Sequence, residues 1–312
     1  MYTENTARDI FLFFKASLSN LLARHLPALY WKAKQDTGRG EGDEDVLAVA
    51  QYFVTCLNDY REQLGLSEEE FAEDLKGKAV LEYGPGDVLG VALLMYAHGA
   101  ESVDCIDRFP LEKTTPKNCL IYRAIMDTLD PKARQRAGLA FNTPGLPESG
   151  FNPSCIRYVI TEDGLVGCEL KYDLVISRAV LEHVNSLERT LGDICNALRM
   201  GGISVHKVDL TSHGLDRYRP FDFLTWPDWT YRAMYSHKGY PNRWRVDKYK
   251  EIIAAIPVEV KKIAPTGELE HDRLHHIYSS LPQAFKKVPP NDLRWLGFWL
   301  VLGRGSSEYP VS

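Results

Sequence analysis

The stretch that decides the fold is an apolar run ending in a glycine-rich turn, Val80-Leu81-Glu82-Tyr83-Gly84-Pro85-Gly86-Asp87-Val88-Leu89-Gly90. The run from Lys78 to Tyr83 predicts a buried strand, and the residues 88–98 predict a helix that ends before Gly99. Glycines between a strand and a helix let the backbone approach a ligand, and the helix start offers free N–H groups. The stretch therefore predicts a ligand site at the end of a strand.

The spacing of this turn argues against a dinucleotide site. Dinucleotide folds use G-x-G-x-x-G, whereas here Leu89 stands at the third glycine position and Gly90 follows it. Pro85 also lacks an N–H that a pyrophosphate would use. Glu82, two residues before the first glycine, would attract a cationic ligand group and repel a pyrophosphate.

A second acidic residue supports a nucleoside-like ligand. Asp107 follows the predicted strand 102–106 and lies 21 residues after Gly86. A carboxylate at this place can accept hydrogen bonds from both hydroxyls of a ribose.

Strands and helices alternate through the rest of the chain, which predicts a parallel sheet covered on both faces. Further strands are expected at 156–160, 173–177, 203–210, 258–263 and 296–302. Helices are expected at 5–34, 45–64, from Ser67 onward, and at 116–129, 187–199 and 246–256, with an irregular insertion over 130–154.

Together these segments resemble the class I S-adenosylmethionine-dependent methyltransferases. The family motif E/D-x-G-x-G-x-x-x-G matches Glu82, Gly84, Gly86 and Gly90, and the family acid after the second strand matches Asp107. Residues 172–177, 180–184 and 198–202 resemble further family motifs, so that the likeness covers about 78–305. It implies a Rossmann-like, doubly wound, mostly parallel α/β sheet of seven strands with an antiparallel last strand.

The same resemblance implies which residues bind S-adenosylmethionine. The methionine part would contact the turn at Glu82, Tyr83, Gly84, Pro85 and Gly86, and the ribose would bind Asp107. The adenine amino group would bind Glu162 or Asp163, with Glu162 slightly favoured, and Ser177 would contribute from the end of the fourth strand. His183 would lie near the methyl group, where it could contact the acceptor or the methyl donor, or stabilise a helix start.

The acceptor is expected beyond the fifth strand, because ligands bind at the carboxyl ends of parallel strands. His213 lies just past that strand and is the first choice for a base, His206 is the second, and Asp209 could orient either one. The spacing of these three residues also permits a divalent metal without pointing to one, so no metal is assigned.

Residues 211–245 are rich in aromatic and basic side chains, which could form a cap over the acceptor or a small core of their own. The H-x-x-D-L-x-x-H segment and the later N-R-x-R element are similar to those of a subset of the family found beside carbohydrate and natural-product biosynthesis enzymes. Arg243, Trp244 and Arg245 are therefore expected to contact an anionic or polyhydroxylated acceptor.

The domain organisation follows from these motifs. Residues 1–77 are expected to form a helical prefix that acts as a lid, a dimer contact or a wall of the substrate site. Residues 78–305 are expected to form the cofactor domain, with 211–245 and 264–290 as acceptor-side insertions and 306–312 as a tail.

Composition narrows the class of protein further. The 312 residues carry a net charge of −5 without a polybasic run, which argues against a nucleic-acid partner. Residues 207–250 alone carry nine Lys or Arg and five Asp, a net of +4. With no apolar stretch long enough to span a membrane, no signal peptide and six scattered cysteines, the sequence predicts a cytoplasmic protein.

The sequence thus predicts an enzyme that transfers a methyl group to a hydroxyl of a small molecule with help from a histidine. Two alternatives stay open: N-methylation of an amine, for which His213 would matter little, and a catalytically silent cofactor-binding scaffold.

Overall fold

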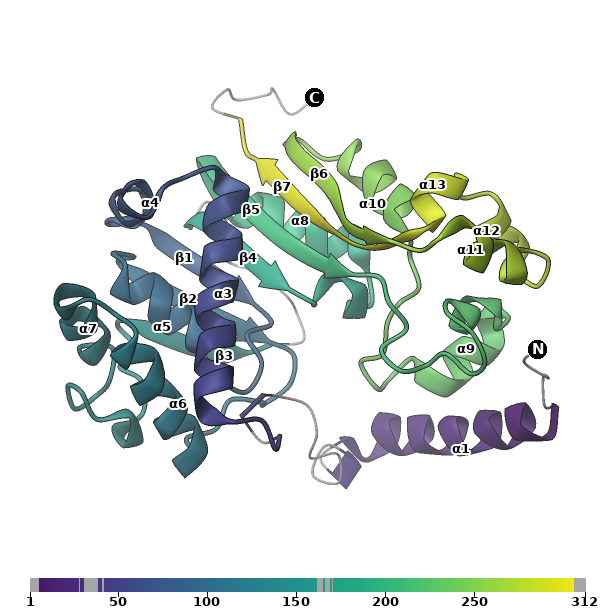
Figure 1. Ribbon diagram of the computed structural model, residues 1–312, viewed down its shortest axis with the longest axis horizontal. Helices are drawn as coiled ribbons and strands as arrows, with labels where there is room; N and C mark the ends of the chain where they lie inside the picture. The colour runs from purple at the N-terminus through teal and green to yellow at the C-terminus, as the bar shows by residue number, and fades with distance from the viewer. Residues whose placement is uncertain are drawn as a thin grey trace.

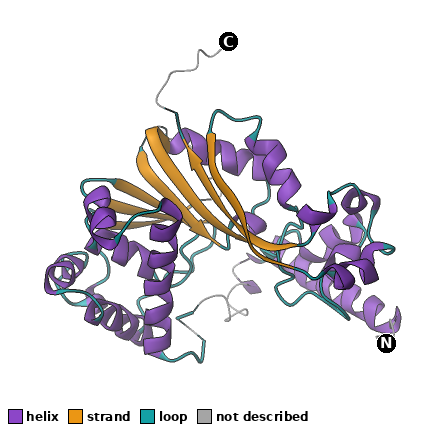
Figure 2. Ribbon diagram, turned by 45° about the horizontal axis from the view of Figure 1, so that its top comes forward, coloured by secondary structure: helices purple, strands orange, loops and turns teal. Residues whose placement is uncertain are grey.

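A seven-stranded sheet forms the centre of the molecule (Figures 1 and 2). The computed structural model describes residues 6–27, 29–30, 39–40, 42–161, 165, 169 and 171–305. Over these residues the strand order is β3-β2-β1-β4-β5-β7-β6. The strands are β1 (Ala79–Tyr83), β2 (Ser102–Asp107), β3 (Ile156–Ile160), β4 (Tyr172–Arg178), β5 (Leu198–Asp209), β6 (Glu259–Glu268) and β7 (Trp295–Gly303).

The direction of the strands confirms the predicted sheet. Strands β1 to β5 pair in parallel, and β7 is antiparallel to both of its neighbours, β5 and β6. The reversal of strand order at β1 and β4 makes the sheet doubly wound, which places a ligand crevice at the carboxyl ends of these two strands. Strand β5 begins earlier than expected, because Gly201 and Gly202 lie within it and its pairing with β4 shifts register there.

Helices cover both faces of the sheet (Figure 1). The α-helices are α1 (Thr6–His25), α3 (Val46–Leu64), α4 (Glu68–Leu75), α5 (Gly90–Ala97), α6 (Pro116–Asp127), α7 (Pro131–Gly138), α8 (Leu187–Ala197), α9 (Asp228–Tyr235), α10 (Val246–Ile253), α11 (His271–Tyr278), α12 (Gln283–Lys286) and α13 (Pro290–Leu293). Short 3-10 helices are η1 (Pro147–Ser149), η2 (Leu181–His183) and η3 (Asp222–Thr225). None of these described helices combines the length and apolarity needed to cross a membrane.

Alternation along the strands builds two separate cores. Val80 packs with α3, α5 and α6 on one face, whereas the next residue, Leu81, packs with α8 and α10 on the other. Successive side chains of a strand point to opposite faces, so an apolar run such as 79–81 is buried on both sides. For this reason β1 forms a central strand of the sheet.

The predicted helical prefix divides into two parts. Helices α3 and α4 belong to the sheet domain, because Phe53, Tyr60 and Phe71 are part of the core over α5 and β1. Helix α1 instead lies beside α9 (Figure 1), where Asn20 Oδ1 accepts the backbone N–H of His237 at 2.9 Å. The expected helix 5–34 is described as α1 only to His25.

The segment 130–154, expected to be irregular, contains α7 and η1. Asp130 caps α7 by accepting the backbone N–H groups of Lys132 and Ala133, and Pro131 occupies the first helical position. Asp followed by Pro is a helix-start signal, so this helix could have been predicted.

The two acceptor-side insertions share a third core. It joins Phe221, Phe223 and Tyr231 of the aromatic segment to Leu274 and Ile277 of α11. Two alternatives were expected for the aromatic segment, a cap over the acceptor or a small core. These rings form the small core.

Candidate active site

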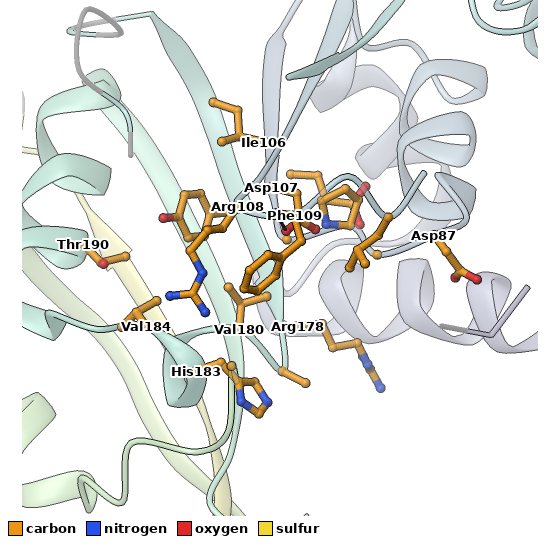
Figure 3. Close-up of a pocket in the computed structure, with 18 of the residues that line it drawn as sticks. Asp87, Ile106, Asp107, Arg108, Phe109, Arg178, Val180, His183, Val184 and Thr190 are labelled. Carbon is orange, nitrogen blue, oxygen red and sulfur yellow. Dashed lines mark hydrogen bonds between the residues drawn. The ribbon is translucent and has the colours of Figure 1, made fainter. Parts of the chain in front are cut away.

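A cavity of about 810 Å³ opens at the carboxyl ends of β1, β2 and β4 (Figure 3). The glycine turn, Asp107, Arg178, His183 and His213 all contribute to its lining. In the view of Figure 3, Asp107 and Arg108 lie near the middle of the cavity and His183 lies below Val180. One cavity therefore brings together the predicted cofactor residues of the glycine turn and β2 with part of the predicted acceptor residues.

At the glycines of the turn, main-chain atoms line the cavity without side chains. Gly84 has φ +72°, and a Cβ there would lie 2.4 Å from Cγ2 of Val180. Gly86 has φ +81°, and a Cβ there would meet no atom within 4 Å, so this backbone faces open space. Gly90 serves packing instead, since a Cβ would lie 2.3 Å from Cγ of Phe53. Gly84 therefore leaves room for the Val180 side chain, Gly86 leaves open space that a ligand can occupy, and Gly90 lets α3 pack against α5.

Glu82 is a buried carboxyl at the edge of this turn. Its residue is 7% exposed, and among the described residues no Lys or Arg forms an ion pair with it. Burial raises the pKa of Glu82 from 4.5 to about 8, and a hydrogen bond from the backbone N–H of Ala92 offsets only part of this rise. A cationic ligand group in the cavity would stabilise the ionised carboxylate.

Asp107 lies between the glycine turn and the cavity. Its Oδ1 accepts the backbone N–H of Phe109 at 3.1 Å. Burial raises the pKa of Asp107, while backbone N–H groups of Phe109, Arg108 and Gly86 lower it. These N–H groups hold the carboxylate at the end of β2, next to Gly86.

Four titratable side chains meet where β5 leaves the sheet. His183 and His213 stack edge to face with ring centres 4.8 Å apart. Nε2 of His213 lies 3.9 Å from Oε1 of Glu182 and 3.8 Å from Oδ2 of Asp209. Burial, and secondarily the neighbouring His213, lower the pKa of His183 to about 4. The predicted pair of His213 and Asp209 is thus brought together, and His183 and Glu182 join it.

Local structure fixes these side chains in place. Asn242 donates its backbone N–H to the carbonyl of Glu182 at 2.6 Å and its side-chain amide to the carbonyl of Leu181 at 2.9 Å. His213 has φ +48°, a left-handed conformation that is costly for a non-glycine residue. A strained backbone of this kind persists only where surrounding contacts stabilise it. With this backbone conformation, His213 lines the cavity.

His206 and Ser177 are placed differently from the expectation. His206 is completely buried, and its Nδ1 lies 2.7 Å from Oγ of Ser177. Burial lowers the pKa of His206 to about 3, and neither residue lines the cavity. Strands β4 and β5 are covered on both faces, so this pair is held inside the sheet, where His206 cannot reach an acceptor.

Glu162 and Asp163, the two candidates for the adenine amino group, lie outside the described residues. The neighbouring Thr161 lines the cavity, at the end of β3. The predicted turn residues Tyr83 and Pro85 line it as well.

Helix α3 contributes lining residues that the sequence did not reveal. Tyr52, Cys56 and Tyr60 project from it toward the cavity. They follow one another at helical spacing, a pattern that a core-facing helix also produces, so no sequence signal separates the two roles. Part of the prefix thus lines the cavity.

Comparison with known families decides the identity of this fold. Residues 58–254 match the family model of the methyltransferase domain. The chain belongs to the class I S-adenosylmethionine-dependent methyltransferases. The methyltransferase is therefore an enzyme whose cofactor is S-adenosylmethionine.

Solved structures and curated proteins add only distant likenesses. A methyltransferase from Mesorhizobium loti is 13% identical, with a TM-score of 0.42, over 74% of this chain and 92% of that chain. One from Methanosarcina mazei is 14% identical, with a TM-score of 0.39, over 74% of this chain and 94% of that chain. No curated protein matches the methyltransferase. The assignment rests on the family match.

The N-R-x-R element of the methyltransferase is structural, contrary to the expectation. Arg245 is 2% exposed, and its guanidinium donates to the carbonyls of Leu210 at 2.7 Å, Leu293 at 3.1 Å and Trp295. Arg243 donates to the carbonyl of Trp226 at 2.7 Å and stacks on Tyr231.

Trp244, between these arginines, packs beside the core over β7, and the lining of the cavity includes none of the three residues. A guanidinium that binds backbone carbonyls has the same sequence signature as one that binds a ligand. These residues therefore give no support to an anionic acceptor.

Replacing Arg245 with Met should destabilise the methyltransferase by about 2–4 kcal/mol, since the buried carbonyls of Leu210, after β5, and Leu293, at the end of α13, would lose their donor. Urea unfolding measures this loss. The matched control is Arg232→Met, because Arg232 is exposed on α9 and should tolerate the change. Equal stability of the two variants would contradict the structural role of Arg245.

Proposed function

We propose that this methyltransferase transfers a methyl group to a hydroxyl of a small-molecule acceptor, such as a carbohydrate or a natural-product intermediate. The observation that carries the proposal is the position of His213 in the same cavity as Glu82, Gly86 and Asp107. A base and the residues expected to bind the cofactor thus share one space.

The lining residues fit S-adenosylmethionine. Glu82 is a buried carboxyl without a cationic partner among the described residues, which suits the positively charged methionine end. The open space at Gly86 admits a ligand against the backbone, and Asp107 is placed to accept hydrogen bonds from a ribose. When bound, the cofactor supplies a methyl group on a positively charged sulfur.

His213 is the group that we assign to the acceptor proton. Methyl transfer is a direct displacement, for which an enzyme mainly supplies alignment and exclusion of water. An alcohol must also lose its proton as its oxygen forms the new bond to carbon, and Nε2 of His213 can receive that proton. Asp209 and Glu182, 3.8 and 3.9 Å from this nitrogen, would stabilise the imidazolium that results.

The acceptor would enter beside the aromatic insertion. Gly239, Tyr240 and Pro241 line the cavity near His183 and His213, while the other rings of the insertion fill its own core. Backbone groups, an aromatic face and histidines together suit a polyhydroxylated molecule.

The proposal is tested by incubating the full chain and S-adenosylmethionine with a panel of sugar and natural-product alcohols and matched amine analogues. We expect O-methylated products, detected by mass spectrometry, in equal amounts to the demethylated cofactor. Methylation of the amines alone would overturn the proposal in favour of an N-methyltransferase. Cofactor binding without turnover on any panel member would favour the silent scaffold.

A further inference from the structure

The cluster of Glu182, His183 and His213 has a feature that proton transfer alone does not use. Both carboxylate oxygens of Glu182 are buried, and neither makes a well-formed hydrogen bond within the described residues; the backbone N–H groups of Glu182 and Asp209 come near enough only to lower the pKa of the carboxyl slightly against the larger effect of burial. Glu182 itself is 1% exposed. Buried polar groups in proteins are nearly always well paired. Burial raises the pKa of Glu182, so without a ligand the carboxyl keeps its proton, and a cation between the two imidazoles would replace that proton.

The side-chain atoms of the cluster lie too far apart to hydrogen-bond with one another but close enough to bind the same ion. Oε1 of Glu182 lies 3.8 Å from Nε2 of His183 and 3.9 Å from Nε2 of His213, beyond hydrogen-bond range. One ligand atom from each of the three residues lies within 4.8 Å of the other two. In the part of the chain that the structure describes, no other group of three such side chains meets this criterion.

A metal ion would need only small movements of these side chains. Ligand atoms on a tetrahedral ion lie about 3.4 Å apart when each bond is about 2.1 Å long. Closing the two carboxylate–imidazole distances, 3.8 and 3.9 Å, to that separation takes about half an ångström each. The ligand atoms that are farthest apart, which lie within 4.8 Å, would have to close by up to about 1.4 Å, which rotation of the two imidazoles can supply. Oδ2 of Asp209, 3.8 Å from Nε2 of His213, is placed to become a fourth ligand.

The type of ligand selects the class of metal. Two imidazoles and one or two carboxylates suit zinc, manganese, iron, cobalt or nickel, whereas magnesium and calcium prefer ligand sets made of oxygen. The backbone of this site is also held in advance, because Asn242 binds the carbonyls of Glu182 and Leu181.

We propose that Glu182, His183 and His213, joined by Asp209, bind one divalent transition-metal ion at the acceptor end of the cavity. The bound ion uses Nε2 of His213, the atom to which the proposed function assigns the acceptor proton. The ion therefore withdraws His213 from catalysis, and the metal-loaded enzyme is inhibited. This second statement rests on the proposed function, whereas metal binding itself does not.

The test is calorimetric titration of the full chain with Zn²⁺ and with Co²⁺ after treatment with a chelator. We expect one ion per chain and a Co²⁺ absorption spectrum of the form that mixed nitrogen and oxygen ligands produce. Glu182→Gln and His183→Ala should each weaken binding at least about tenfold. The control is His275→Ala, which removes an exposed imidazole of α11 and should leave binding unchanged.

Thermal unfolding separates loss of a ligand from loss of the fold, and His183→Ala removes a partly exposed side chain if Glu182→Gln proves unstable. Absence of saturable binding, or wild-type affinity in a folded variant, would overturn the metal site. Activity that requires the metal, with loss on chelation, would overturn the inhibition. If the proposed function alone is wrong, metal binding persists while no alcohol is methylated.

Discussion

Replacing Glu82 with Gln should weaken S-adenosylmethionine binding by roughly 10- to 100-fold, because the variant loses the buried carboxylate that we place against the cationic end of the cofactor. Hydrogen bonds to charged groups contribute about 1.5–3 kcal/mol, which corresponds to that range of affinity. Calorimetry measures the change. The matched control is Glu69→Gln, since Glu69 is exposed at the start of α4 and far from the cavity lining.

The same substitution should change how stability depends on pH. With the pKa of Glu82 raised from 4.5 to about 8, the folded cofactor-free protein keeps a proton that the unfolded chain loses above about pH 5. The stability of the wild type should therefore fall as the pH rises from about 5 to about 8, and Glu82→Gln should remove this part of the fall.

Each pKa unit corresponds to about 1.4 kcal/mol, and after relaxation of the buried site we expect a difference of at least about 1 kcal/mol at pH 8. Thermal unfolding across this pH range, without and with cofactor, measures it. Bound cofactor should shrink the difference in slope between the two proteins, because its positive charge favours the ionised carboxylate. Parallel curves for wild type and variant would show that Glu82 does not titrate in this way.

Replacing His213 with Ala should lower kcat for a hydroxyl acceptor by roughly 10²- to 10⁴-fold, the usual contribution of a general base. Binding of the demethylated cofactor should change little, because the predicted cofactor contacts are elsewhere in the cavity. The control is again His275→Ala, which removes an exposed histidine of α11. A rate within about twofold of the wild type would remove His213 from the mechanism, as expected for an amine acceptor that enters already deprotonated.

The fold was predictable because its signals are local. The apolar run before Gly84 is buried on both faces, and the strand ends at Tyr83, immediately before the glycine turn. Asp107 closes β2 at the expected place. A strand with its turn, and an acid at the end of a neighbouring strand, are specified by a few consecutive residues.

The acceptor side was less predictable because its contacts join distant segments. Arg245 has the charge of an anion-binding residue, yet three backbone carbonyls from other elements surround it. His206 has the alternation of a strand histidine, but only the sheet shows that Ser177 lies beside it. Glu182 comes within reach of His213 only because η2 and the loop after β5 meet in space. None of these partners can be read from spacing along the chain.

The central claim is that one cavity, bounded by the glycine turn and Asp107, binds S-adenosylmethionine. Calorimetric titration of the full chain with the demethylated cofactor, on the wild type and on Asp107→Ala, tests it most directly. We expect one molecule bound per wild-type chain and binding at least about tenfold weaker in the folded variant, since the ribose would lose its carboxylate partner. Absence of binding to the wild type, or equal affinity in the variant, would contradict the claim.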